Sequence, residues 1–354
     1  MKKSVPGAAA LAGKNHSIMS SGIEQPPSLP KKITVGTLFE EKKDEWQLQL
    51  IAGRDGFETH YVVTPDINRP GMALARWTGV FLRERIQIVG STELSYLNTL
   101  SAEEYARAVR ILLELNPVAV IITKDLALKE DWISEGNRLQ VPIIRTPLDT
   151  TPFIHRLSAF LDYRLAPETY IHGDLVDVFG VGLLITGESG IGKSECALDL
   201  VDRGHRLIAD DLVRVLRRGT GILMGYSSAK TPALAHHIEV RGVGIVDVYS
   251  LYGVRAIRVQ KRIEVEVRLV PWQSGVECER AGIDEKFSEI LGVKIPLVTI
   301  PVVPGKNLAL VHEVIAKNHI LKVFGYYPAQ RFNDELIRLM SKTPIDPYLT
   351  DDQE

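Results

Sequence analysis

Eight consecutive residues in the middle of the chain match a phosphate-binding loop in type and spacing. They are Gly187, Glu188, Ser189, Gly190, Ile191, Gly192, Lys193 and Ser194. The glycines let the backbone curl so that its N–H groups face a polyphosphate, while the lysine can reach the β- and γ-phosphates and the serine hydroxyl can bind Mg²⁺. The apolar run LLIT precedes the loop and ECALDLVDRG follows it, so we expect a strand to enter the loop and a helix to leave it. This context favours an ATP site with Mg²⁺ over a chance glycine-rich turn.

Two adjacent carboxylates follow at the end of the apolar segment HRLIADD. They are Asp210 and Asp211. A phosphoryl-transfer site needs a carboxylate beside the metal or beside the attacking hydroxyl, although an ordinary polar strand end would also contain such residues. Adjacent side chains on an extended strand point to opposite faces. We therefore expect one of the two acids, and not both, to transfer the proton.

The elements that must position these residues follow from the hydrophobic pattern. Before the loop, short apolar runs at 85–90, 118–125 and 141–148 alternate with amphipathic stretches, which predicts a small parallel α/β sheet. Ser101 and Glu104 have the spacing of a capping box, so a helix should begin there. The fold class expected from this pattern is α/β.

The second half of the chain has a different texture. We expect strands at 181–187, 237–248 and 263–270, a helix from Gly192 and another across 306–323. The pattern divides the chain into a disordered tail (1–31), an N-terminal α/β domain (32–161) and a P-loop domain (162–354). The amphipathic stretch FIHRLSAFLDYRL (153–165) is expected to link the two domains without joining the core of either.

Composition excludes several classes of protein. Of 354 residues, 45% are hydrophobic and 24% are charged, as in ordinary globular proteins, and the net charge of −2 indicates no particular partner. Cys196 and Cys278 fit neither a disulfide framework nor a metal-binding pair, which favours the reducing cytoplasm. No apolar run approaches the roughly 20 residues of a membrane span. A nucleic-acid interface is not expected, because acidic residues directly follow a basic cluster of Arg255, Arg258, Lys261 and Arg262.

Five segments together resemble the HPr kinase/phosphorylase family in order and spacing. They are YIHGDLVDVFG (170–180), GESGIGKSE (187–195), RGHRLIADD (203–211), IEVRGVGIVDV (238–248) and PVVPGKNLA (301–309). The resemblance extends from about Ile33 onward. It implies a bifunctional enzyme of carbon regulation that phosphorylates a seryl residue of the phosphocarrier protein HPr with ATP. The same enzyme would remove that phosphate with inorganic phosphate, giving pyrophosphate.

The resemblance also implies roles for single residues. Lys193 looks like the lysine that holds the phosphates, Ser194 like a magnesium ligand and Glu239 like the second magnesium ligand. Without the resemblance, Glu239 would be read as a solvated strand residue, since isolated charges usually are.

Three further residues resemble the family's catalytic groups. Asp211 looks like the base that deprotonates the seryl hydroxyl and, in reverse, the acid, while His172 resembles the active-site histidine and Arg280 the catalytic arginine. A lone histidine at a strand end or a lone arginine is more often structural.

The family further implies a P-loop core akin to that of phosphoenolpyruvate carboxykinase and a homo-hexamer of two-domain subunits. One departure stands out, because Val303 and Lys306 occupy positions that the family usually fills with arginines in a loop tied to dephosphorylation. Lysine keeps the charge without arginine's planar fork, and valine loses it. We therefore expect these two differences to weaken phosphorolysis more than the kinase activity.

Two other functions share the phosphate site. A nucleotide-gated binding module would use ATP and Mg²⁺ only to order its loops, and would leave His172, Asp211 and Arg280 without a role. A P-loop kinase of a small metabolite would differ only in its acceptor pocket. Labelled ATP with candidate HPr separates these three functions.

Overall fold

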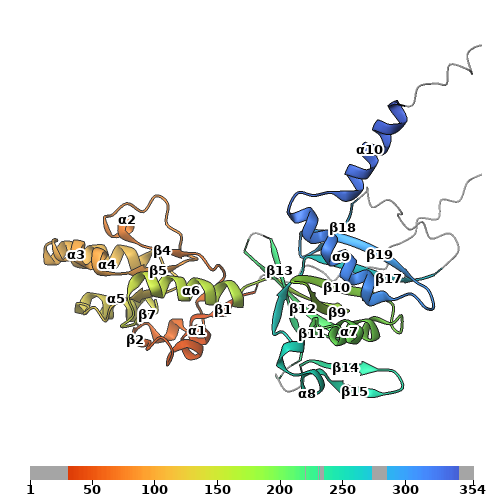
Figure 1. The fold of residues 1–354 in the computed structure, drawn as a ribbon. Coiled ribbons are helices and arrows are strands. Elements are labelled where there is room, and N and C mark those ends of the chain that lie inside the picture. The colour runs from red at the N-terminus through yellow and green to blue at the C-terminus, as the bar shows by residue number, and fades with distance from the viewer. Residues whose placement is uncertain (1–30, 220, 230, 232–234, 273–284, 343–354) are drawn as a thin grey trace, which may run out of the picture.

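The computed structural model describes residues 31–342 except 220, 230, 232–234 and 273–284. Figure 1 shows two groups of elements, one formed by residues 33–164 and the other beginning at residue 168. Arg280, Cys278 and the predicted tail up to residue 30 lie outside the described residues. Within the described part of the chain, no helix is both long and apolar enough to cross a bilayer.

The N-terminal group is built on a five-stranded sheet. Its strands, in order across the sheet, are β2 (Gln49–Ala52), β7 (Ile143–Arg145), β6 (Val120–Ile122), β5 (Ile86–Val89) and β4 (Ile67–Asn68). The predicted parallel sheet is confirmed for β4, β5, β6 and β7, and β2 joins it antiparallel to β7. A separate antiparallel ribbon pairs β1 (Ile33–Thr34) with β3 (Tyr61–Val62).

Helices cover both faces of this sheet, as continuous apolar strands require. They are α1 (Val35–Lys42), α2 (Gly71–Leu74), α3 (Ser91–Asn98), α4 (Ala102–Glu114), α5 (Glu130–Leu139) and α6 (Thr150–Arg164), with a short 3₁₀ turn η1 (Arg54–Gly56). In β6, Ile121 packs with α1 and α6, while Val120 and Ile122 pack with α4 and α5. Successive side chains of β6 therefore belong to two hydrophobic cores, one on each face of the sheet.

Helix α4 begins as predicted. The Ser101 hydroxyl accepts the Glu104 N–H at 3.3 Å, and the Glu104 carboxylate accepts the Ser101 N–H at 3.4 Å. The expectation for residues 153–165 was wrong. Helix α6 buries Phe153, Leu157 and Leu161 completely in the N-terminal core. Its polar residues suggested a linker, but the apolar residues at intervals of four form a stripe that packs on the sheet. The domain boundaries themselves stay a prediction.

The C-terminal group contains a six-stranded sheet. Its order is β11 (Arg206–Ala209), β9 (Asp174–Val178), β10 (Val181–Gly187), β17 (Val265–Pro271), β19 (Val293–Val302) and β18 (Lys286–Ile290). Strands β10, β17 and β19 are parallel, whereas β9 and β11 are antiparallel to their neighbours. The predicted strand at 181–187 is confirmed as β10, and the strand at 263–270 is confirmed as β17 with slightly shifted ends.

This sheet is the middle one of three layers (Figure 1). One face packs on α7 (Lys193–Asp202) and α9 (Leu308–Val323), which confirms the two predicted helices. The other face packs on a four-stranded sheet of β16 (Gln260–Arg262), β13 (Ile222–Ser227), β12 (Leu212–Arg218) and β8 (Glu168–His172). In β10, Leu183 and Ile185 face the helices, and Leu184 faces the second sheet. The P-loop strand is therefore buried on both sides.

The remaining elements lie at the periphery. The expected single strand at 237–248 is instead a hairpin of β14 (His237–Val240) and β15 (Gly244–Asp247), because Gly242 and Gly244 adopt positive φ angles of 83° and 103° and turn the chain. After it come α8 (Val248–Tyr252) and a 3₁₀ turn η3 (Val254–Ala256). Helix α10 (Pro328–Lys342) ends the described chain.

Candidate active site

The phosphate-binding loop leaves the end of β10 and enters α7, as predicted. Gly187 has a φ of 148°, and a Cβ there would lie 2.6 Å from the Leu269 carbonyl oxygen, so only glycine fits beside β17. The Lys193 side chain is buried and folds back onto the loop, where Nζ donates to the carbonyls of Gly187 at 3.2 Å and Glu188 at 3.1 Å. The ammonium is thus held at the mouth of the loop, within reach of a bound polyphosphate.

Antiparallel pairing brings the acidic residues to this loop. Asp174, the first residue of β9, lies opposite Ile185 near the end of β10. Ala209, the last residue of β11, lies opposite Leu175, so the next residues of the chain, Asp210 and Asp211, lie beside Asp174. Two neighbouring strand pairs therefore carry the acids to the edge of the sheet where the loop begins.

His172 and Asp211 face each other at this edge. The Nδ1 atom of His172 lies 3.2 Å from Oδ1 of Asp211, and the two side chains are 51% and 74% exposed. This exposure leaves the Asp211 carboxylate open to a molecule that approaches from solvent. The prediction that Asp210 and Asp211 point apart is confirmed, but strand alternation is not the reason. Strand β11 ends at Ala209, and Asp211 has a positive φ of 64°, which turns its side chain outward.

Asp210 is directed inward, toward Ser194 and the backbone of Glu239. Its Oδ2 accepts the Glu239 N–H at 3.3 Å. Burial raises the pKa of Asp210, and a hydrogen bond with the Ser194 hydroxyl partly offsets that rise. Asp174 is fully buried, and burial followed by repulsion from Asp210 raises its pKa well above the usual 3.8. Carboxyls in such surroundings are common at functional sites.

The residues predicted to bind magnesium lie around Asp210. Ser194 interacts with that carboxylate through its hydroxyl, and Glu239 contacts it through its backbone. Nowhere in the described residues do three or more His, Cys, Asp or Glu side chains gather in a way that could hold a metal. Mg²⁺ in nucleotide sites keeps several waters and uses one or two protein ligands plus phosphate oxygens. Asp210 Oδ1 is buried without a hydrogen-bond partner among the described residues, which fits a nearby cation.

Sequence reasoning missed two residues of this site. The Arg241 guanidinium lies against the phosphate-binding loop, because a Cβ on Gly190 would come within 2.6 Å of its Nη2. Asp174 is fully buried beside Asp211, and its carboxylate accepts the Asp211 N–H. Both stood within the segments that carried the family resemblance, and Asp174 was an acid within an apolar run, which is an unusual place for an unpaired carboxylate.

The loop that contains Val303 and Lys306, where the sequence departs from the family pattern, follows the parallel strand β19. Strands β10, β17 and β19 run in the same direction, so their carboxyl ends, and the segments that follow them, share one edge of the sheet. Lys306 Nζ donates to the Pro301 carbonyl at 3.3 Å, and the Lys306 N–H closes a turn on the Val303 carbonyl at 3.2 Å. Arg280 falls within the segment after β17 that lies outside the described residues.

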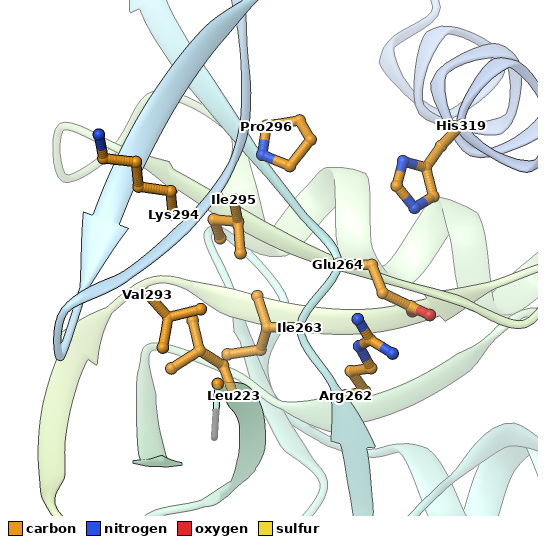
Figure 2. A pocket seen from close by; sticks show the side chains of 10 residues that line it. Leu223, Arg262, Ile263, Glu264, Val293, Lys294, Ile295, Pro296 and His319 are labelled. Atoms are coloured by element: carbon orange, nitrogen blue, oxygen red, sulfur yellow. The ribbon is translucent and has the colours of Figure 1, made fainter. Parts of the chain in front are cut away.

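A small pocket lies away from these residues. Its volume is about 150 Å³, and Figure 2 shows Arg262, Glu264 and His319 on one side of it and apolar side chains of Ile263 and Val293 on the other. Glu264 is already paired, because it accepts hydrogen bonds from Lys261 Nζ at 2.8 Å and from the Gly182 N–H at 2.6 Å. No residue of the phosphate-binding loop or of the acidic group lines this pocket.

Comparison with known proteins shows which family the chain resembles. Residues 33–161 match the family model described as HPr Serine kinase N terminus, and residues 163–336 match the HPr Serine kinase C-terminal domain. A protein named HPr kinase/phosphorylase from Chloroherpeton thalassium is 41% identical over 87% of this chain and 90% of the relative. One of the same name from Bacillus subtilis is 41% identical over 83% of this chain and 93% of the relative.

A solved structure of the HPr(Ser) kinase/phosphatase from Coxiella burnetii is 33% identical, covers 46% of this chain and 98% of its own, and has a TM-score of 0.40. Two family models that together cover most of the chain, and relatives near 40% identity along nearly their whole length, carry the conclusion. The chain belongs to the HPr kinase/phosphorylase family.

Proposed function

We propose that this protein transfers the γ-phosphoryl group of ATP to a seryl hydroxyl of HPr and also reverses the modification by phosphorolysis. The kinase uses ATP, as its family does. The observation that carries the proposal is the His172–Asp211 pair, exposed at the same sheet edge as the phosphate-binding loop and Lys193. Phosphoryl transfer depends mostly on positioning and charge compensation, and this edge supplies groups for both.

In the forward direction, Asp211 accepts the proton of the seryl hydroxyl as its oxygen attacks the γ-phosphorus. His172, with Nδ1 3.2 Å away, orients that carboxylate and limits its rotation. Lys193 exchanges its two loop carbonyls for phosphate oxygens and offsets the negative charge that gathers on them. The loop N–H groups and the start of α7 hold the remaining phosphates.

In the reverse direction, an oxygen of inorganic phosphate attacks the phosphorus of phosphoseryl HPr. The bond between phosphorus and the seryl oxygen breaks, and Asp211 returns a proton to that oxygen, so the products are HPr and pyrophosphate. The same groups can serve both reactions because each transfers a phosphoryl group between the seryl oxygen and a phosphate oxygen, and Asp211 takes up the seryl proton in one reaction and returns it in the other.

Ser194 and Glu239 are proposed as the protein ligands of Mg²⁺, with Asp210 beside them. When bound, this ion would offset negative charge on the phosphates of ATP. The proposed role of Arg280 as the catalytic arginine rests on the family resemblance. The Arg241 guanidinium lies against Gly190 of the phosphate-binding loop and therefore offers the phosphates a cation in addition to Lys193.

We also propose a cytoplasmic location and a homo-hexamer. The two cysteines without a disulfide pattern support the first. The second is supported by helix α10, which exposes apolar side chains four residues apart at Phe332, Leu336 and Met340. Apolar faces of this kind are typical of subunit contacts.

The direct test incubates the purified chain with γ-labelled ATP, Mg²⁺ and HPr, and then adds inorganic phosphate. We expect label on a seryl residue of HPr and its later release as pyrophosphate. ATP binding without transfer to HPr would favour a nucleotide-gated module, and transfer only to a small molecule would favour a metabolite kinase.

A further inference from the structure

Asp174 is an acid for which the proposed reaction has no use. Its side chain is fully buried at the first position of β9, beside the end of the P-loop strand. A carboxyl taken out of water is costly unless its oxygens find partners. The contacts of these two oxygens therefore indicate what the residue does.

The first oxygen holds the backbone of the proposed base. Oδ1 of Asp174 accepts the Asp211 N–H at 2.9 Å. The Asp211 carbonyl in turn accepts the Gly173 N–H at 2.9 Å. Both polar backbone groups of Asp211 are thus fixed by residues 173 and 174.

This fixation is needed because Asp211 adopts a strained conformation. Its φ of 64° lies in the left-handed region, which residues other than glycine seldom adopt and which persists only where surrounding contacts impose it. That conformation also turns the Asp211 side chain out of the sheet and toward His172. Without the Asp174 acceptor, the buried-side N–H of Asp211 would lose its partner and the turn could relax.

The second oxygen lies on the side of Asp174 where Asp210 is found. Oδ2 of Asp174 and Oδ1 of Asp210 are both buried and lack a hydrogen-bond partner among the described residues. The two carboxyls lie close enough to influence each other, and repulsion from Asp210 adds to burial in raising the pKa of Asp174. Asp174 therefore contacts the turn at Asp211 on one side and Asp210, the partner of Ser194, on the other.

We propose that Asp174 is a positioning residue for the phosphoryl transfer: its carboxyl accepts the Asp211 amide and thereby holds the base in the turn that faces His172. The inference rests on the proposed role of Asp211. Asp174 is fully buried and acts through the backbone of Asp211, so we expect its effect in the rate of transfer and not in the binding of ATP.

The test compares three substitutions at this position in the full-length protein. Asp174→Asn keeps an oxygen for the Asp211 N–H and an amide donor for Asp210, so its kcat for HPr phosphorylation should stay within about threefold of wild type. Asp174→Val has a suitable shape for a buried strand but no acceptor, and its kcat should fall by about tenfold or more with the KM for ATP unchanged. If Asp174→Val does not fold, Asp174→Ser serves, because its hydroxyl is one carbon shorter and does not replace the carboxyl oxygen.

A matched control removes the other buried acid of the same strand. Asp177 pairs with Arg258 at the far end of β9 and takes no part in the site. Asp177→Val should lower the Tm and leave kcat unchanged. An equal kcat loss in Asp177→Val, or an Asp174→Asn variant as slow as Asp174→Val, would show a general effect of strand stability and overturn the proposal.

Asp211→Asn, measured in parallel, separates this inference from the function on which it rests. If Asp211→Asn phosphorylates HPr at the wild-type rate, the proposed base is wrong. If Asp211→Asn is inactive while Asp174→Val keeps the wild-type kcat, only the positioning role is wrong. In the Asp211→Asn background, adding Asp174→Val should cost no further activity, because two residues acting on one proton transfer are not additive.

Discussion

His172, the last residue of β8, and Asp211, the residue before β12, meet with Nδ1 and Oδ1 3.2 Å apart. The contact exists because β8 pairs with β12, in which His172 lies opposite Leu212, the residue after Asp211. An imidazole beside a carboxylate at an exposed edge can orient the base without covering it. The pair therefore offers the sharpest test of the proposed reaction.

Asp211→Asn removes the proton acceptor at nearly constant shape. We expect ATP binding to be retained and kcat for HPr phosphorylation to fall by roughly a hundredfold or more. Nucleotide titration and steady-state kinetics on the same preparation would measure the two effects separately. A comparable loss in Asp210→Asn, with Asp211→Asn active, would move the base to the neighbouring residue.

Lys193→Ala should abolish both phosphorylation and phosphorolysis, because the ammonium offsets charge on the phosphoryl group in either direction. Within the described part of the chain, its ammonium donates hydrogen bonds to two carbonyls of its own loop, so we expect the Tm to change little. Thermal unfolding and labelled transfer to HPr would check both statements. A folded variant with a near-wild-type rate would refute the assignment of the loop, and an unfolded one would show a structural lysine.

The sequence predicted the elements that its local chemistry dictates. The capping pair at Ser101 and Glu104 marked the start of a helix, and the LLIT run before Gly187 marked the strand that enters the loop. Both signals depend only on neighbouring residues. The phosphate-binding loop was therefore assigned from the sequence at the right place between β10 and α7.

Features that depend on partners distant in the sequence were not predicted. The sequence of α6 suggested a linker, because the sheet on which Phe153 and Leu157 pack is formed by residues distant in the chain. The acid in an apolar run marks Asp174 as unusual, but nothing local names its partner, because Asp211 is 37 residues away and becomes a neighbour only through the pairing of β9 with β11. The left-handed turn at Asp211 follows from that same contact.

Val303→Arg should raise the rate of phosphorolysis several-fold while leaving the kinase rate nearly unchanged. Phosphorolysis must bring inorganic phosphate beside a phosphoserine, so it gains more from an added cation than ATP does, which already has Lys193. The loop follows β19 at the edge of the sheet that carries Gly187. Phosphate-dependent release of pyrophosphate measures the effect.

Lys306→Ala is the internal control in the same loop, and it should lower phosphorolysis by removing the cation that donates to Pro301. Equal changes of both rates in Val303→Arg, or no change in either, would mean that the loop does not bind phosphate in this protein.

Glu313→Gln should destabilise the protein at neutral pH and have a smaller effect in acid. Glu313 on α9 accepts two hydrogen bonds from Arg203 at 2.9 Å each and one contact from His205, which together lower its pKa to about 2, with burial opposing. A lowered carboxyl pKa stabilises the fold above the unfolded value of about 4.5, and this contribution is lost as the pH falls from there through about 2.

We therefore expect the Tm difference between wild type and Glu313→Gln to be several degrees at pH 7 and to shrink steadily below pH 4.5. Glu285→Gln is the matched control, because Glu285 forms an exposed ion pair with Lys322 of the same helix and should change the Tm little at any pH. A Tm difference for Glu313→Gln that stays constant between pH 7 and pH 3 would contradict the argument.

The arrangement of strands also bears on how the protein is made. The P-loop strand β10, the acids of β9 and β11, and β8 with its partner β12 all lie between residues 168 and 218, whereas the parallel neighbours β17 and β19 come later in the chain. Pairings between segments close in sequence form faster than pairings that must close long loops. During synthesis, His172, Lys193 and Asp211 can therefore come together before the chain that seals the other edge of β10 has been translated, and early protection of β9 and β10 amides in pulsed hydrogen exchange would record that order.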